Sequence, residues 1–176
     1  MASLYFSLMS KPAAIDQAEN SSVAKRFVRY APLVVWMGVI FFASTSGFSA
    51  DNTSRFIRPL LRWLFPKRSE AELDVFHFLI RKTGHFLGYA VLGFLAHRAF
   101  VTSSRSFIRR RWFELALALV VLNALVDELH QSFVPSRTGS IYDSMIDIAG
   151  GLTVLLIFKF WRRGNERTAN DGADVL

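Results

Sequence analysis

Three apolar stretches in the second half of the chain carry ionisable or polar side chains at one end only. The first opens with R-K-T-G-H-F-L-G-Y (81–89), the second closes with N-A-L-V-D-E-L-H-Q-S-F (123–133), and the third opens with Y-D-S-M-I-D-I-A-G-G (142–151). If these are consecutive membrane spans, all three polar ends lie on the same side of the bilayer. Charge at membrane depth is costly, and it is usually paired, faces a cavity and serves a function. We therefore expect one polar site on that side.

Helical periodicity groups the polar residues into three stripes, one on each stretch. The stripes consist of Lys82, His85 and Tyr89; Asn123, Asp127 and Gln131; and Asp143, Asp147 and Gly150. Glu128 lies about a quarter-turn from Asp127, and Arg137 is in the short loop before the third stretch. Three neighbouring helices would then surround a cavity that contains four carboxylates, the cations Lys82 and Arg137, and the imidazoles His85 and His130.

This set predicts a binding site for an anionic headgroup. Lys82 and Arg137 would bind a phosphate, Arg137 through its two-pronged guanidinium. Asp127 and Glu128 would orient these cations or bind a divalent metal. The remaining members of the expected ligand-binding set are Tyr89, Gln131, Asp143 and Asp147.

Three other hypotheses stay open. In the first, the protein is a membrane enzyme, a lipid-phosphate hydrolase or transferase, with His85 as nucleophile or general base oriented by Glu128 or Asp127, the expected catalytic residues. In the second, the charges are a structural ion-pair cluster that fixes the helix ends. The third is a proton-coupled carrier, which ranks last because four spans would need to oligomerise to form a pathway.

Composition favours a membrane protein. The chain has 176 residues, 52% of them hydrophobic, yet its net charge is +7, and Lys and Arg cluster between the apolar blocks. It has no cysteine, which excludes disulfides and thiolate metal sites. No zinc-type histidine spacing is present, so we expect no metal and no other cofactor, although His85, His130 and the carboxylates are potential ligands. The charges suit anionic lipids, and nothing predicts nucleic acid as a partner.

The chain divides into an all-α membrane domain with a tail at each end. We expect a flexible cytoplasmic tail over 1–24, a membrane domain over 25–163, and a polar C-terminal tail over 164–176. The domain is predicted to be a bundle of four transmembrane helices. The expected spans are 30–50, 83–101, 112–134 and 140–159, each close to the roughly 20 residues that cross a bilayer.

The segment between the first two spans is predicted to be an interfacial amphipathic helix. Arg55, Arg58 and Arg62 fall on one side of this helix, where we expect contact with lipid headgroups. Pro59 lies inside the segment, and a proline at such a position can break a helix. Ser69 followed by Glu72 resembles a capping box, which predicts a new helix running into the second span. Gly84 and Gly88 are spaced for close helix packing. The small polar residues of F-F-A-S-T-S (41–46) are expected to serve packing.

Four spans place both termini on one side, together with 13 of the 21 Lys and Arg. The positive-inside rule then predicts cytoplasmic termini and an outward-facing site. The predicted location is a bacterial cytoplasmic (inner) membrane, crossed several times. The expected partners are membrane lipids, with a lipid-linked cell-wall precursor as a further candidate, and an oligomer is compatible with the sequence.

The combination K-x-x-H-F-x-x-Y (82–89), D-E-x-x-Q-x-F (127–133), P-S-R (135–137) and D-x-x-x-D-x-x-G (143–150) resembles the VanZ-like family of integral membrane proteins. The resemblance covers about residues 33–160. It implies a helical membrane protein with shared polar residues at the outer face and a link to glycopeptide resistance of the teicoplanin type and to envelope homeostasis. Two positions depart from the family pattern: Ser136 stands where glycine is usual, and Asp147 stands where asparagine is usual.

Overall fold

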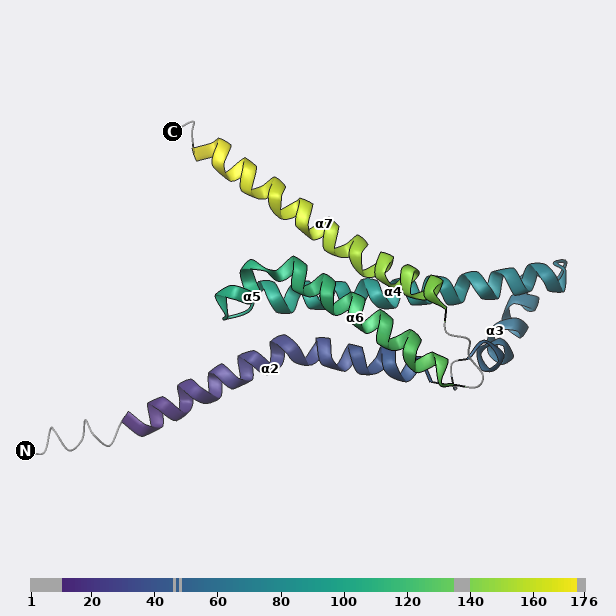
Figure 1. Ribbon diagram of the computed structural model, residues 1–176, viewed down its shortest axis with the longest axis horizontal. Coiled ribbons are helices and arrows are strands. Elements are labelled where there is room, and N and C mark those ends of the chain that lie inside the picture. Colours follow the sequence, from purple (N-terminus) through teal and green to yellow (C-terminus); the bar gives the residue numbers. More distant parts are fainter. Residues whose placement is uncertain (1–10, 46, 48, 135–139, 174–176) are drawn as a thin grey trace, which may run out of the picture.

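A computed structural model of the chain describes residues 11–45, 47, 49–134 and 140–173, with side chains described from residue 23 to 165 except Asp51. These residues form six helices and no strand (Figure 1). The helices are α2 (Lys11–Ala43), α3 (Ala50–Leu64), α4 (Glu70–Val101), α5 (Ser106–Arg110), α6 (Trp112–Ser132) and α7 (Ile141–Ala173). The all-helical prediction is therefore confirmed.

Both terminal helices extend into the segments that the sequence assigns to the tails. Residues 11–24 are the first turns of α2 and residues 164–173 the last turns of α7, whereas residues 1–10 and 174–176 lie outside the described part. Strong helix formers such as Ala, Gln and Glu carry α2 backwards beyond the apolar run. At its other end α2 stops at Ala43, not at residue 50, because a run of Ser, Thr and Gly favours turns.

The segment between the first two expected spans is amphipathic, as predicted, and forms the 15-residue helix α3 without a break at Pro59. Phe56 and Trp63 project outward, with 81% and 76% of their surfaces exposed. The arginine side differs from the prediction of a lipid contact. Arg58 pairs with Asp74 and Arg62 pairs with Glu70, both on the first turns of α4, because α3 folds back against that helix.

Helix α4 begins where the sequence predicts and continues without interruption into the second expected span. Ser69 Oγ accepts a bond from the Glu72 N–H and the Glu72 carboxylate accepts one from the Ser69 N–H, which is a complete capping box. Hydrogen bonds from Ser69 and from Arg68 lower the pKa of the Glu72 carboxyl. This cap fixes the register of the whole helix, and therefore where its polar residues lie.

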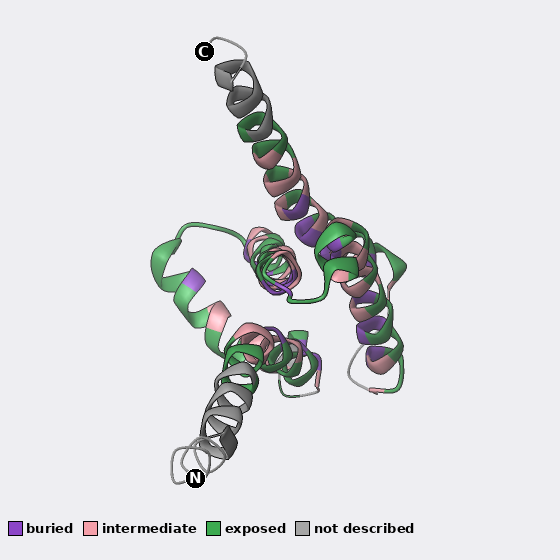
Figure 2. Ribbon diagram, turned by 90° about the vertical axis from the view of Figure 1, so that its left-hand side faces the viewer, coloured by how far each residue is buried: buried purple, intermediate pink, exposed green. Residues whose placement is uncertain are grey.

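Helices α4, α6 and α7 pack closely through small residues. Leu92 and Ala96 of α4, Ala116 and Val120 of α6, and Leu155 of α7 have no exposed surface. A Cβ added at Gly93 would lie 2.7 Å from the carbonyl oxygen of Gly151. Figure 2 shows buried residues on the sides of the helices that face one another.

The close-packing glycines are not the predicted pair. A Cβ added at Gly84 or Gly88 would meet nothing within 4 Å, whereas Gly93, Gly150 and Gly151 touch backbone or side chains of neighbouring helices. Spacing alone marked Gly84 and Gly88 as a pair, but their side of α4 faces open space. Both residues instead line the cavity described below.

Two of the described helices contain a stretch long and apolar enough to cross a membrane, Val23–Ala43 in α2 and Ile141–Asn165 in α7. Helix α6 contains three acidic residues, and the part of α4 from residue 83 onwards contains His85, His97 and Arg98. These polar side chains interrupt the apolar stretches of both helices. By length and composition, two of the four expected spans are therefore candidate membrane spans. The first turns of α2 and the last turns of α7 lie at the same end of the molecule, with α3 at the opposite end (Figure 1).

Candidate functional site

Two polar contacts join α4 to α7 one helical turn apart. Lys82 Nζ donates to Asp143 Oδ1, and His85 Nδ1 lies 3.2 Å from Asp147 Oδ1. Lys82 and His85 are three residues apart on α4, and Asp143 and Asp147 are four residues apart on α7. Each spacing is about one helical turn, which lets both contacts form between the same two helices. Asp147 has no exposed side-chain surface, while the His85 side chain keeps 20%. The first and third predicted stripes therefore face each other.

The second stripe reaches this cluster through Asp127, and the turn after α2 contributes as well. Gln131 Nε2 donates to Asp127 Oδ2 at 3.2 Å, and Ser44 Oγ, in the turn directly after α2, donates to Asp127 Oδ1. Asp127, Gln131 and Ser44 are each 2–3% exposed. Ser44 thus takes part in the polar cluster, a role beyond the packing that the sequence predicts for it.

Glu128 and His130, both expected in the cluster, make other contacts. The Glu128 carboxylate accepts a bond from the backbone N–H of Ser140, before α7. The His130 ring packs against Phe41, with ring centroids 4.5 Å apart. Arg137 lies outside the described residues. The partner of His85 is therefore Asp147, not the expected Asp127 or Glu128, because helical periodicity gives the face of each residue but not the rotation between helices.

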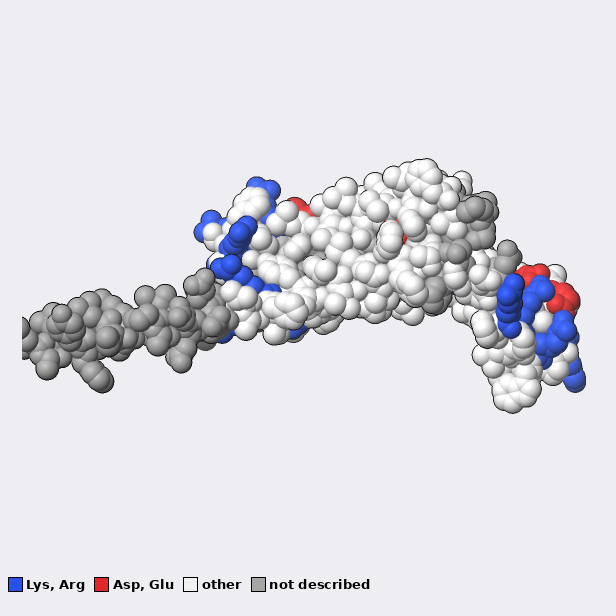
Figure 3. Space-filling view, turned by 90° about the horizontal axis from the view of Figure 1, so that it is seen from below, with Lys and Arg blue, Asp and Glu red and all other residues white. Residues whose placement is uncertain are grey.

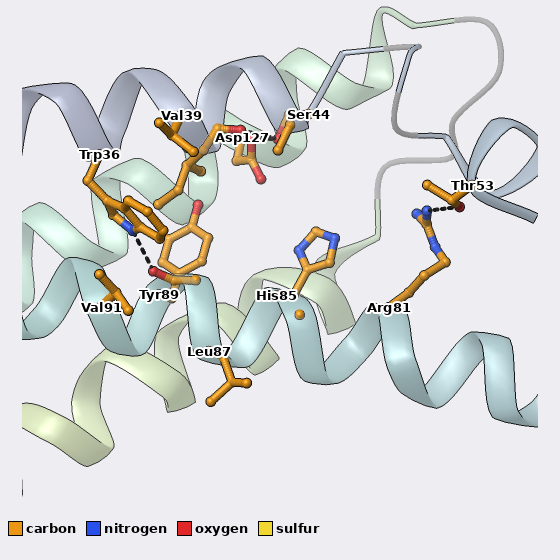
Figure 4. A pocket seen from close by; sticks show the side chains of 14 residues that line it. Trp36, Val39, Ser44, Thr53, Arg81, His85, Leu87, Tyr89, Val91 and Asp127 are labelled. Carbon is orange, nitrogen blue, oxygen red and sulfur yellow. Dashed lines mark hydrogen bonds between the residues drawn. The ribbon is translucent and has the colours of Figure 1, made fainter. Parts of the chain in front are cut away.

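A cavity of about 480 Å³ opens beside this cluster, between α2, α3, α4 and α6. One part of its wall is apolar and is formed mainly by Trp36, Val39, Ile40, Leu87 and Val91. The other part is polar and is formed by Ser44, Thr53, Arg81, His85 and Asp127. Figure 4 shows this order along the cavity, with Tyr89 between Trp36 and His85 and with Arg81 at the far end beside Thr53.

Two cavity residues were not singled out by the sequence. Arg81 Nη1 donates to Thr53 Oγ1 at 3.1 Å, which ties α4 to α3 at the polar end. Trp36 Nε1 donates to the Gly88 carbonyl at 2.8 Å, which ties α2 to α4 at the apolar end of the cavity. Arg81 could have been found from its position directly before Lys82, because the two side chains are only one residue apart on the helix. The indole was recognisable only as an aromatic residue inside an apolar run.

Tyr89 has an exposed fraction of 2%, and its hydroxyl has no hydrogen-bond partner among the described residues. Asp147 Oδ2 and Glu128 Oε1 are also buried and have no hydrogen-bond partner among the described residues. Buried polar atoms are normally satisfied by protein, water or a bound group. The cluster therefore has hydrogen-bonding capacity that these residues do not use among themselves.

The geometry permits two kinds of chemistry. The cavity can hold a molecule with one apolar and one polar end, since its wall changes character along its length. His85 faces the cavity with Asp147 at its Nδ1, an arrangement that can set the tautomer and the orientation of an imidazole. Lys82 is engaged by Asp143 and does not line the cavity.

Comparison with known proteins gives one match. A model of the family described as VanZ/LLP1 matches residues 29–162, which include all of the polar cluster and the cavity. No curated protein and no solved structure matches the chain.

Proposed function

Because the chain belongs to the VanZ/LLP1 family, we propose that it is a multi-pass membrane protein whose cavity binds the headgroup of an anionic lipid or lipid-linked cell-wall precursor. The observation that carries the proposal is the cavity itself, with its apolar wall and its single polar end. The link to glycopeptide resistance and envelope homeostasis that the sequence resemblance implies is part of this proposal.

The distribution of charge supports a bundle of four spans. In the space-filling view of Figure 3, Lys and Arg gather at the two ends of the molecule, and the face between them is almost free of charge. Exposed apolar side chains occur on each of the four long helices, for example Val35 on α2, Phe94 on α4, Leu122 on α6 and Ile157 on α7. Lipid is the solvent that makes such a surface favourable.

The shape of the cavity supports an amphipathic ligand. An acyl chain would lie against Trp36, Val39 and Leu87, where it removes apolar surface from contact with water. The headgroup would then reach Arg81, His85 and Ser44 at the polar end. A free inorganic anion would use only that second part.

Arg81 is the described cation best placed to bind the headgroup. It lines the polar end of the cavity, and a guanidinium matches the geometry of a phosphate through paired N–H donors. Lys82, the cation expected from the sequence, is one residue away but is held by Asp143 on another side of α4. Arg137 remains a candidate from the sequence alone.

The test compares two phospholipids with the same acyl chains. Detergent-purified protein stripped of native lipid is titrated with phosphatidylglycerol, phosphatidylcholine and inorganic phosphate. We expect saturable binding of phosphatidylglycerol, weaker binding of phosphatidylcholine, and little binding of phosphate. Arg81→Gln should weaken phosphatidylglycerol binding about tenfold or more, as expected for a lost charge-assisted hydrogen bond.

Lys82→Gln is the matched control, since it removes the same charge from the neighbouring residue outside the cavity. It should change the affinity less than Arg81→Gln does. Equal affinity of the wild type for both phospholipids, or equal losses in the two variants, would contradict headgroup binding in the cavity.

A second candidate function rests on the contact between His85 and Asp147. A carboxylate at Nδ1 can orient the imidazole ring and fix its tautomer, as in enzymes that use histidine as a general base or nucleophile. The protein would then hydrolyse or transfer a lipid-linked phosphate or ester. Release of headgroup from a lipid panel by the purified protein, lost in His85→Gln, would support this candidate, and no turnover by the wild type would end it.

A further inference from the structure

His85, Asp127 and Asp147 come from three sequence segments and meet at one point. Each offers one ligand atom, a ring nitrogen or a carboxylate oxygen, and these three atoms lie within 4.8 Å of one another. His85 is half-buried and both aspartates are buried. Among the described residues, this is the group of histidine and acidic side chains that converges closely enough to hold an ion.

The carboxylate of Asp147 supplies an independent observation. Its side chain has no exposed surface, Oδ1 faces His85, and Oδ2 has no hydrogen-bond partner among the described residues. A buried carboxylate is stable when it is fully hydrogen-bonded, paired with a cation or bound to a metal. Asp147 is at most partly satisfied by His85, and it adds to the negative charge that Asp127 brings to the same place.

We propose that His85, Asp127 and Asp147 bind a divalent transition-metal ion, with zinc and manganese as the candidates. An imidazole nitrogen beside two carboxylates favours these ions over magnesium and calcium, which prefer oxygen ligands throughout. Metal–ligand bonds of about 2.0–2.2 Å place tetrahedral ligand atoms about 3.4 Å apart, so atoms that lie up to 4.8 Å apart need to approach by up to about 1.4 Å. The ion would neutralise the carboxylates and give Asp147 Oδ2 a partner.

The site extends beyond headgroup binding and does not depend on it. His85 and Asp127 also line the cavity, so the ion would lie at its polar end. The second hydrogen-bonding shell is already present for one ligand, because Ser44 and Gln131 both donate to Asp127. Metal binding can be measured without lipid, and therefore its failure and the failure of headgroup binding are separate results.

Calorimetric titration of the chelator-treated protein with Zn²⁺, Mn²⁺ and Mg²⁺ tests the proposal. We expect one equivalent of Zn²⁺ or Mn²⁺ to bind, with much weaker binding of Mg²⁺. Asp147→Asn and His85→Gln should each weaken binding at least tenfold. Asp143→Asn is the matched control, because it removes a carboxylate one turn away on the same helix that is engaged by Lys82 and lies outside the set; it should leave the affinity within about threefold.

Absence of saturable binding by the wild type, or an equal loss in Asp143→Asn, would overturn the metal site. Circular dichroism shows whether each variant is folded. If a ligand variant does not fold, the absorption spectrum of wild type loaded with Co²⁺ decides. Bands typical of nitrogen and oxygen coordination are expected at one equivalent, and a spectrum identical to that of the free ion would overturn the proposal.

Discussion

Individual polar residues in this protein connect helices that are far apart in the sequence. Asp127 is the clearest case, since it accepts hydrogen bonds from Ser44, 83 residues away, and from Gln131, one turn further along its own helix. Such bonds are valuable in a low-dielectric interior because an unsatisfied buried group is costly. Loss of one such side chain should therefore have a larger effect than loss of a neighbour that bonds only locally.

Ser44→Ala removes one donor from the buried Asp127 carboxylate. We expect it to destabilise the protein by about 1–3 kcal/mol, the usual effect of leaving a buried acceptor partly unsatisfied. Thermal unfolding in detergent gives the comparison with Thr45→Ala, whose hydroxyl bonds locally to the Phe42 carbonyl. Equal stability of the two variants would show that the Ser44 contact is unimportant.

His77 makes the contact between α3 and α4 sensitive to pH. Burial, and after it the charge of Arg81, lowers the pKa of His77 from its ordinary value of 6.5, while Asp74 opposes the shift and Arg58 adds to it. His77 Nε2 lies 3.2 Å from Thr53 Oγ1 of α3. Below about pH 6.5 the unfolded chain binds a proton that the folded chain resists, so stability falls as the pH falls through this window.

The measurement is the unfolding temperature at pH 7.5 and pH 5.5. The wild type should lose more stability on acidification than His77→Gln, which has no proton to bind at this position. The same loss in both proteins would mean that other groups cause the pH dependence.

Among the helices, α3 contacts α4 through ion pairs on one side and exposes apolar side chains on the other. Arg58 and Arg62 pair with α4, whereas Phe56 and Trp63 project away from the protein. An exposed apolar face beside a charged one is typical of a helix that lies in the membrane interface. We therefore expect α3 to rest on the bilayer with Phe56 and Trp63 among the lipids.

Spin labels can test this placement without background substitutions, because the chain has no cysteine. In vesicles, a label at Trp63→Cys should collide mainly with oxygen, which dissolves in lipid. A label at Arg55→Cys on the same helix should collide mainly with a water-soluble nickel chelate. Water-like collision rates at both positions would place α3 away from the membrane.

The crossing of α4 and α7 depends on glycine. A Cβ at Gly93 would lie 2.7 Å from a backbone oxygen of α7, which cannot move aside as a flexible side chain would. Gly93→Ala should therefore destabilise the protein by about 1–3 kcal/mol in thermal unfolding. Gly38→Ala, which meets nothing within 4 Å, should be neutral or stabilising; similar losses in both would contradict the close crossing.

At the scale of the whole molecule, the arrangement predicts membrane topology. The turn between α3 and α4 lies at the α3 end, whereas the loop between α4 and α5 lies at the opposite end with the outer turns of α2 and α7 (Figure 1). Lys67 belongs to that turn, and Ser104 belongs to that loop. With the termini in the cytoplasm, a membrane-impermeant maleimide should label Lys67→Cys in intact cells and spare Ser104→Cys and Asn165→Cys. Labelling of Lys67→Cys and Ser104→Cys from the same side would contradict a four-span bundle.

The sequence predicted those parts of the molecule that local patterns determine. The Ser69–Glu72 motif located the start of α4, and charges at alternating ends of apolar stretches indicated that Lys82, Asp127 and Asp147 belong to one side. The sequence could not predict which side chains pair across helices, because the rotation of α4 against α7 decides that His85 contacts Asp147. The same rotation places Gly93 against α7 and Gly84 at the cavity, although both are glycines of α4.

Native mass spectrometry of the protein purified in mild detergent tests most directly whether the cavity binds an anionic lipid. Wild type should retain an anionic phospholipid or lipid-linked precursor, whose mass identifies the ligand. Arg81→Gln should lose it, and so should Gly84→Phe, whose ring would fill the cavity from a position with open space around it. Wild type without bound lipid, or equal retention by all three proteins, would contradict a headgroup site and favour a structural role for the polar cluster.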